Sequence, residues 1–312
     1  MTDAGAPVGA SDAIDVLVAG YASIDVAYRA SAPPQAGATA LLQGPVAPAW
    51  RCGGCGPGAA VALARNGCRV GLLTWLGDDG DGRACLRAWA DAGIDQRGVV
   101  VASGEVSPRS FLFYDPAGSA TCYYHPSGSA TLRLNAGGRK LLADTRALAV
   151  TVGPAALTEE LLVARRSDQP LVWNVKADAD AFPLAIRSRL VQEAAVICLN
   201  RDELPFVAAA LPSSAAGEVD EPALIAAIVR CGGGLVVVTA GAAGCRVASP
   251  EGMVDVPANP VQVADPTGAG DGFFGAFVAA WLSGADAAGA AAAAARYVTA
   301  FLQERAAVET ET

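Results

Sequence analysis

A glycine-rich turn in the last third of the chain delivers one carboxylate to the start of an apolar helix. Residues 264–274 read ADPTGAGDGFF, and Asp271 stands at the junction. Gly268, Ala269 and Gly270 let the backbone approach a ligand, and the first amides of a helix have no partners inside the helix. These amides and the helix dipole favour an anion. Asp271 beside a phosphate suits general-base chemistry on an attacking hydroxyl, whereas a plain helix start with a surface Asp is the simpler interpretation.

A second candidate site lies in the N-terminal half. Asp25 follows the first predicted strand, residues 16–20, and a carboxylate there can accept hydrogen bonds from two neighbouring hydroxyls, as sugar recognition requires. An Asp at a strand end also often only caps a turn. Gly53, Gly54 and Gly58 precede an Ala-rich helical segment and would let the backbone approach a substrate closely.

Two further strand ends carry polar groups. Asn200 and Glu203 follow the predicted strand 196–199, and one amide plus one carboxylate can order the waters around Mg²⁺. The same pair fits a helix capping box, and both roles can hold together. Lys176 follows the predicted strand 171–175 and offers a point charge for a phosphate, although a charge in such a turn is more often solvated.

Composition narrows the class of protein. The chain has 312 residues, 53% of them hydrophobic, and a net charge of −9, which argues against a nucleic-acid surface. Residues 1–12 lack the pattern of a signal peptide and read as a disordered lead-in, and no apolar run reaches membrane length. We therefore expect a cytoplasmic enzyme.

The cysteines fit a reducing compartment, because most of the eight lie in apolar segments. Cys52 and Cys55 form a C-x-x-C spacing, which allows a redox pair, but packing in a core or pocket is the favoured interpretation. The chain's single His cannot complete a zinc site with them.

Short apolar runs alternate with helical patterns, which predicts a doubly wound α/β fold: a mostly parallel sheet with helices on both faces and ligands at the carboxyl ends of the strands. The predicted strands are 16–20, 70–75, 147–152, 171–175, 196–199 and 235–239, and the predicted helices are 59–66, 83–92, 272–282 and 287–304.

Two segments interrupt this alternation. Residues 26–51 hold four prolines without a helical period, and residues 107–124 read as a β-hairpin around a turn at 115–118. Together they predict a small β-sheet that stands off the main domain; an edge hairpin on the main sheet is the alternative.

The motifs as a set resemble the ribokinase-like (PfkB-type) carbohydrate kinases over about residues 15–303. Residues 265–271 match the family's Asp-Thr-x-Gly-Ala-Gly-Asp at Asp265 and at residues 267–271, with Pro266 between Asp265 and Thr267. Residues 200–203 match Asn-x-x-Glu, and residues 241–244 match a Gly-x-x-Gly turn. The stretch 53–67 is similar to Gly-Gly-x-x-x-Asn before an Ala-rich helix. In this stretch Gly58 replaces the Asn, and Cys55 stands where ribokinases proper carry Lys. No P-loop or Rossmann glycine pattern competes with this resemblance.

The resemblance implies a role for each group of residues. Asp271 would take the proton from the acceptor hydroxyl, and the amides of Gly268, Ala269 and Gly270 would form the anion hole. The residues that would bind the acceptor are Asp25, Gly53, Gly54, Gly58 and Lys176. The residues that would bind ATP and Mg²⁺ are Asn200, Glu203, Thr239, Gly241 and Gly244. In many members the positions of Asp265 and Thr267 give oxygens to a monovalent cation, so K⁺ is a candidate cofactor.

The implied protein is an ATP-dependent kinase that phosphorylates a hydroxyl of a sugar or sugar-containing small molecule, in one domain over residues 13–312. Segments of about 26–51 and 107–124 would form a lid, which in several members is also the dimer contact, so a homodimer through the lid is a candidate assembly. Two alternatives stay open: a nucleoside kinase of the same fold, and a non-catalytic small-molecule sensor. The aromatic residues that would stack on a base are Phe111, Phe113, Tyr123 and Tyr124. Because Cys55 and Gly58 remove two polar groups, we expect an acceptor with one polyol end and one bulkier, less polar end.

Overall fold

A large mixed sheet forms the centre of the protein. The computed structural model describes residues 13–31, 37, 39–115, 120–212, 220–232, 234–261 and 265–310. Eight strands run in the order β14-β13-β12-β11-β10-β9-β1-β4. The β12–β13 and β13–β14 pairs are antiparallel, and the other pairs are parallel. Their bounds are β1 Val16–Ala19, β4 Val70–Leu73, β9 Ala147–Val150, β10 Leu171–Asn174, β11 Val196–Asn200, β12 Leu235–Thr239, β13 Cys245–Ser249 and β14 Gly252–Val256. The predicted mostly parallel sheet is confirmed.

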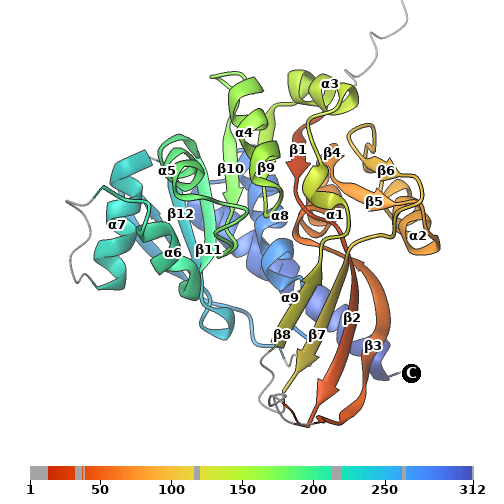
Figure 1. Ribbon diagram of the computed structural model, residues 1–312. Coiled ribbons are helices and arrows are strands. Elements are labelled where there is room, and N and C mark those ends of the chain that lie inside the picture. The colour runs from red at the N-terminus through yellow and green to blue at the C-terminus, as the bar shows by residue number, and fades with distance from the viewer. Residues whose placement is uncertain are drawn as a thin grey trace, which may run out of the picture.

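Helices cover both faces of this sheet (Figure 1). Because side chains alternate along a strand, Leu17 and Ala19 of β1 enter one core, and Val16 and Val18 enter the other. The first core is closed by α3 (Ala136–Asp144), α4 (Ala155–Ala164), α5 (Leu184–Glu193), α6 (Leu204–Ala208) and α7 (Glu221–Gly232); the second is closed by α1 (Cys55–Arg65), α2 (Gly80–Asp91), α8 (Ala269–Leu282) and α9 (Ala287–Thr310). No helix in the described part of the chain combines the length and apolar character needed to cross a membrane.

Several element boundaries differ from the sequence-based expectation, among them the starts of α1 and α2 and the run 70–75. Helix α1 begins at Cys55 rather than 59, directly after Gly54, whose φ of 97° turns the chain into the helix. Helix α2 begins at Gly80 because the Asp79 side chain accepts a hydrogen bond of 2.7 Å from the amide of Gly82 and caps the helix. The run predicted as one strand at 70–75 divides into β4 and β5 (Trp75–Gly77), and β5 pairs with β6 (Val100–Ala102) in a separate two-stranded sheet.

The two segments outside the alternation build one four-stranded sheet in the order β3-β2-β7-β8, which we call the small sheet. Its strands are β2 (Ser23–Ala30), β3 (Leu42–Gly53), β7 (Arg109–Tyr114) and β8 (Ala120–His125). It projects from the main body at the lower right of Figure 1. The separate sheet is therefore confirmed, and the edge-hairpin alternative is wrong; most of the hairpin turn, residues 116–119, lies outside the described residues, as does the lead-in 1–12.

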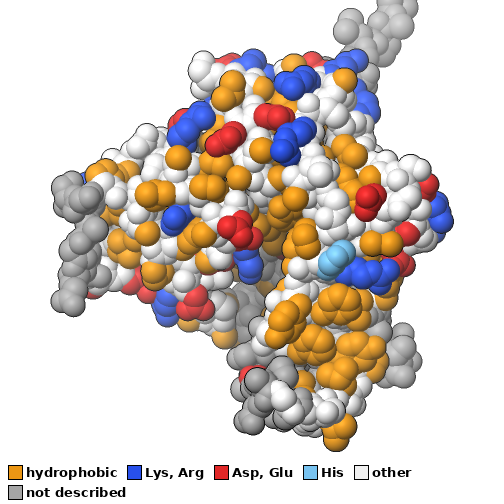
Figure 2. Space-filling view, viewed as in Figure 1, with side chains coloured by type: hydrophobic (Ala, Val, Ile, Leu, Met, Phe, Trp, Pro, Cys, Tyr) orange, Lys and Arg blue, Asp and Glu red, His pale blue; other side chains and the backbone are white. Residues whose placement is uncertain are grey.

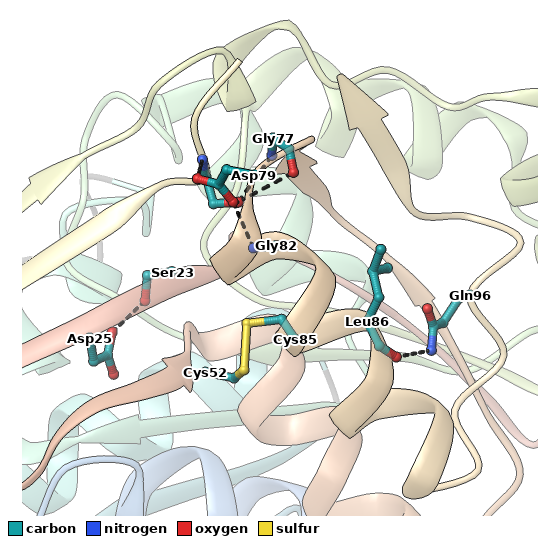
Figure 3. Close-up of a disulfide and its surroundings, with 10 residues drawn as sticks. Ser23, Asp25, Cys52, Gly77, Asp79, Gly82, Cys85, Leu86 and Gln96 are labelled. Atoms are coloured by element: carbon teal, nitrogen blue, oxygen red, sulfur yellow. Dashed lines mark hydrogen bonds between the residues drawn. A yellow bond between two sulfur atoms is a disulfide. The ribbon is translucent and has the colours of Figure 1, made fainter. Parts of the chain in front are cut away.

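A disulfide joins the small sheet to α2. Cys52 of β3 pairs with Cys85 of α2, and their Cα atoms lie 5.5 Å apart (Figure 3). The expectation that Cys52 is a packing thiol is wrong, and Cys85, which lies in an apolar segment, is not a free thiol either. The pairing also rules out a disulfide within the C-x-x-C spacing, because Cys55 is a free thiol.

Candidate active site

The glycine-rich turn ends in a left-handed residue that starts α8. Gly268 has φ 80°, a conformation that costs a non-glycine residue energy, and Gly272 N donates to Gly268 O at 2.8 Å. The amide of Ala269 is used inside the turn, where it donates to Pro266 O at 3.0 Å. Gly268 and Gly270 line the neighbouring cavity. The turn thus presents the start of α8, with its dipole, to that cavity.

Asp271 is placed in the first turn of α8 and is held from the sheet. Asn174, at the end of β10, donates from Nδ2 to Asp271 Oδ1 at 2.9 Å. Burial raises the pKa of Asp271 to about 6, although the charge of Lys176 and the hydrogen bonds from Asn174 and Cys55 pull it down. A carboxylate with a pKa near 6 is ionised at neutral pH and still basic enough to take a proton.

An inner cavity of about 250 Å³ lies in front of Asp271. The ends of three adjacent parallel strands, β10, β11 and β12, contribute Asn174, Asn200 and Thr239 to its wall. Lys176 lines it as well. Burial lowers the pKa of Lys176, but the nearby groups of Cys55, Glu203 and Asp271 outweigh burial and raise it, so this lysine stays charged. The cavity therefore joins a basic carboxylate, a cation and a helix N-terminus.

Asn200 and Glu203 form the capping box that the sequence predicts. Asn200 Oδ1 accepts from Glu203 N at 3.0 Å, and Glu203 Oε2 accepts from Asn200 N at 2.9 Å, at the short helix Arg201–Glu203. Glu203 is buried, which raises its pKa, and it lines the inner cavity. Mg²⁺ in nucleotide sites needs only one or two carboxylates beside phosphates and water, so this buried carboxylate fits the ion.

An outer cavity of about 710 Å³ adjoins the inner one, and Thr239, Gly270 and Phe273 line both. Gly241 and Gly244 line the outer cavity with positive φ angles of 55° and 90°, which keep this turn free of side chains. The start of α8 thus lies between two adjoining cavities, and the volume of the larger one suits a nucleotide.

Asp25 lies on β2 of the small sheet, close to the glycine segment. Ser23 Oγ donates to Asp25 Oδ1 at 2.5 Å (Figure 3). Burial raises the pKa of Asp25, against hydrogen bonds from Ser23 and Ser110 and the charge of Arg51. A Cβ on Gly53 would lie 2.1 Å from Asp25 Oδ2, so only glycine leaves this carboxylate in place.

Two other glycines stand close to the site. A Cβ on Gly58 would lie 3.2 Å from the Asp271 Cβ, which brings the start of α1 against the first turn of α8. Gly54 packs against the backbone of Tyr21 and Ala22, where a Cβ would approach within 2.4 Å. Of the sequence-predicted acceptor residues, Lys176 lines the inner cavity and Gly58 lies against Asp271, whereas Asp25, Gly53 and Gly54 are not part of that cavity's described wall.

Strand register decides which aromatic residues can reach this space. Ser110 hydrogen-bonds Asp25 and is buried, so Phe111 and Phe113, which alternate with Ser110 on β7, point to the other face of the small sheet. Phe111 pairs with Tyr123, which shares that outer face. Base stacking by these three aromatic side chains within one chain is therefore not supported by the register.

Tyr124 behaves differently. It pairs with Ser110 on the inner face, its ring centroid lies 5.4 Å from that of Tyr21, and its hydroxyl donates to Ala22 O at 3.3 Å. An aromatic pair thus borders the Asp25 side of the site.

The resemblance implies that Asp265 and Thr267 bind a monovalent cation, but other side chains of the protein already contact their oxygens. Arg51 Nη1 donates to Asp265 Oδ2 at 2.5 Å, and the Tyr114 hydroxyl donates to Asp265 Oδ1 at 2.8 Å. Tyr114 also hydrogen-bonds Thr267. These oxygens do not fit an added metal ion.

Sequence reasoning missed Arg51, Tyr114 and Arg305, which come together around Asp265 from β3, β7 and α9. Only Arg51 carried a local signal, since it stands two residues before the glycine pair at 53 and 54. Asn174 lies near the end of the predicted strand 171–175, but no local signal marks its contact with Asp271.

Comparisons with known proteins show what this chain is similar to. A sequence model described as pfkB family carbohydrate kinase matches residues 14–311. The ATP-dependent ribose-1-phosphate kinase of Halopiger xanaduensis is 26% identical over 288 residues, covering 88% of this chain and 86% of that protein. The nucleoside kinase of Methanothermobacter thermautotrophicus is 23% identical over 235 residues, covering 75% and 72%.

Solved structures share the fold. The ribokinase of Cryptococcus neoformans, in complex with ADP, has a TM-score of 0.76 at 25% identity and covers 97% of this chain and 100% of that chain. The Burkholderia thailandensis nucleoside kinase, in complex with inosine, has a TM-score of 0.77 at 21% identity, covering 92% and 91%.

Proposed function

The chain belongs to the pfkB family of carbohydrate kinases, and we propose that it transfers the γ-phosphate of ATP to a hydroxyl of a sugar or sugar-containing small molecule. The observation that carries this proposal is the position of Asp271 at the start of α8, between the outer and the inner cavity. A nucleotide in the outer cavity would direct its terminal phosphate at the helix start, next to an acceptor in the inner cavity.

In this proposal Asp271 is the general base. The acceptor oxygen attacks the γ-phosphorus as the bond to the β,γ-bridging oxygen breaks, and the hydroxyl proton passes to the Asp271 carboxylate. Asn174 fixes the orientation of the carboxylate through its 2.9 Å hydrogen bond. Lys176 and the dipole of α8 neutralise charge on the phosphoryl group.

Asn200 and Glu203 would hold Mg²⁺ through water, and the bound ion would neutralise the phosphate oxygens of the nucleotide. The capping box supports this role because it fixes Glu203 in the wall of the inner cavity. Thr239, Gly241 and Gly244 would border the nucleotide in the outer cavity.

The small sheet would act as the lid over the acceptor, since Asp25, Ser110 and Tyr124 come from its inner face.

The outer face of the small sheet supports a homodimer. Trp50, Phe111 and Tyr123 lie in one cross-strand row through Val26 and are 38%, 38% and 58% exposed. Figure 2 shows hydrophobic side chains gathered over this sheet. Such a patch marks an interaction surface, and light scattering on Tyr123→Glu tests whether it joins two copies.

A nucleoside acceptor is the second candidate, and the pairing of Tyr21 with Tyr124 favours it. Two rings beside Asp25 would stack on a base while the carboxylate holds the ribose hydroxyls. Phe111, Phe113 and Tyr123 lie on the other face of the small sheet and would not stack on this base.

The test is ADP release across a panel of sugars, sugar phosphates, substituted sugars and nucleosides at fixed ATP and Mg²⁺. Turnover with any member supports a kinase, whereas nucleotide and acceptor binding without turnover would favour the sensor alternative. Cys55 and Gly58 favour an acceptor with a bulkier, less polar end over free ribose. This inference would be contradicted if free ribose were the best acceptor by about tenfold, because one or two unpaired hydroxyls should cost ribose at least that factor.

A further inference from the structure

A buried cluster of protein groups holds the turn that precedes α8. Asp265 is 4% exposed and accepts three short hydrogen bonds: from Arg51 Nη1 at 2.5 Å, from the Tyr114 hydroxyl at 2.8 Å and from Thr267 N at 3.0 Å. Arg305 Nη1 lies 3.6 Å from Asp265 Oδ2. A carboxylate offers about four acceptor directions, of which hydrogen bonds use three here, and the Arg305 guanidinium lies beside the same carboxylate.

The oxygens of Thr267 are engaged as well. Its hydroxyl hydrogen-bonds the Tyr114 hydroxyl, and its carbonyl accepts from Arg305 Nη1. Arg305 in turn stacks on the ring of Phe301, 5.0 Å from its centroid, which fixes the guanidinium over the turn. Protein groups therefore face both carboxylate oxygens of Asp265 and the hydroxyl and carbonyl oxygens of Thr267.

The charges in the cluster balance without an ion. Two guanidinium groups, Arg51 and Arg305, face two carboxylates, because Arg51 Nε also lies 3.9 Å from Asp25 Oδ2. Burial opposes the charge of Asp265, but the hydrogen bonds from Thr267 and Arg51 lower its pKa to about 2, so it is ionised. A further cation would add a like charge beside both guanidinium groups.

We propose that the guanidinium groups of Arg51 and Arg305 take the place of a monovalent metal ion at this turn, so that the protein reaches its active structure without K⁺. The replacement of a metal ion by the two guanidinium groups follows from the geometry alone, whereas activity without K⁺ rests on the proposed kinase function. Because Arg51 belongs to β3, the small sheet itself supplies the charge that holds the turn before the anion-binding glycines.

The first experiment compares the wild-type chain in KCl and in tetramethylammonium chloride at equal ionic strength, with the melting temperature and the rate of ADP release as readouts. The expected melting temperatures agree within about 1 °C and the rates within about twofold. A rise of about 3 °C or a rate increase above about fivefold in KCl would overturn the proposal. If no acceptor supports turnover, the kinase function fails, but the melting temperatures still decide this question.

A second experiment removes the guanidinium. Arg51→Met should lower the melting temperature by several degrees and the rate by about tenfold or more in either salt, because Asp265 is left buried and underpaired. Arg51→Lys should fall between Arg51→Met and wild type, and Arg139→Met, an exposed site on α3, serves as the matched control. If Arg51→Met behaves like Arg139→Met, Arg51 does not hold the turn. If Arg51→Met does not fold, the wild-type salt comparison decides.

Discussion

Asn174 Nδ2, at the end of β10, donates a hydrogen bond of 2.9 Å to Asp271 Oδ1 in the first turn of α8. This contact links the main sheet to the helix that carries the candidate base, across 97 residues of sequence. It fixes one carboxylate oxygen of the candidate base.

The pH dependence of the rate follows from the raised pKa of Asp271, about 6. The base works only when deprotonated, so kcat/KM should fall about tenfold per unit as the pH drops below about 6 and level off above it. A profile that stays flat down to about pH 4.5 would exclude a base with this pKa.

Lys176 gives the matching variant. Its charge lowers the pKa of Asp271, so Lys176→Met should move the acidic limb of the kcat/KM profile to higher pH. Lys140→Met, at the exposed and only other lysine, should leave the limb in place. If the acidic limb lies at the same pH in both variants, the charge of Lys176 does not set the pKa of Asp271.

Replacing Glu203 should change the Mg²⁺ concentration that the reaction needs. Gln at this position keeps the capping box, since its side-chain carbonyl can still accept from Asn200 N, but it removes the negative charge. Glu203→Gln should therefore raise the Mg²⁺ concentration for half-maximal rate by about tenfold with an unchanged melting temperature. Glu159→Gln, exposed on α4, is the control. Identical Mg²⁺ titrations would reduce Glu203 to a helix cap.

Gly53 should be intolerant of a methyl group for a specific reason. Its Cβ would lie 2.1 Å from Asp25 Oδ2, so Gly53→Ala should displace the carboxylate and raise KM for the acceptor about tenfold or more, with KM for ATP little changed. Gly80→Ala, whose Cβ meets open space, is the matched control. An unchanged acceptor KM in Gly53→Ala would remove Asp25 from acceptor binding.

Much of the fold could be predicted because its signals are local. Alternating strands and helices are read from periodicity, and the glycine turn, the capping box and the β7–β8 hairpin each lie within a short segment. What could not be predicted depends on residues far apart in sequence. Arg51 reaches Asp265 across 214 residues, and only the folded chain brings them together.

The direction of the aromatic residues shows a second limit. Alternation on β7 indicates that Phe111 and Ser110 face opposite ways, but the sequence does not say which face covers the site. The contact of Ser110 with Asp25 settles it. The partner of Cys52 was hidden for the same reason, since Cys85 lies on a helix that packs beside β3 only after folding.

The disulfide should contribute to stability by restricting the unfolded chain. Its two cysteines are 33 residues apart, for which loop-closure entropy gives about 3–4 kcal/mol of unfolding free energy. A reductant should lower the denaturant midpoint of the wild type and leave Cys85→Ala unchanged. A wild-type midpoint that is insensitive to the reductant would contradict this contribution.

The most direct measurement of the central claim is the turnover of Asp271→Asn. Asn keeps the size of the side chain and an oxygen for the Asn174 hydrogen bond but cannot take the proton. With the best acceptor, kcat should fall about 10²–10⁴-fold, while ATP affinity measured by calorimetry stays within about twofold of wild type. A loss of kcat below about fivefold, with chemistry shown to be rate-limiting, would contradict the role of Asp271 as the general base.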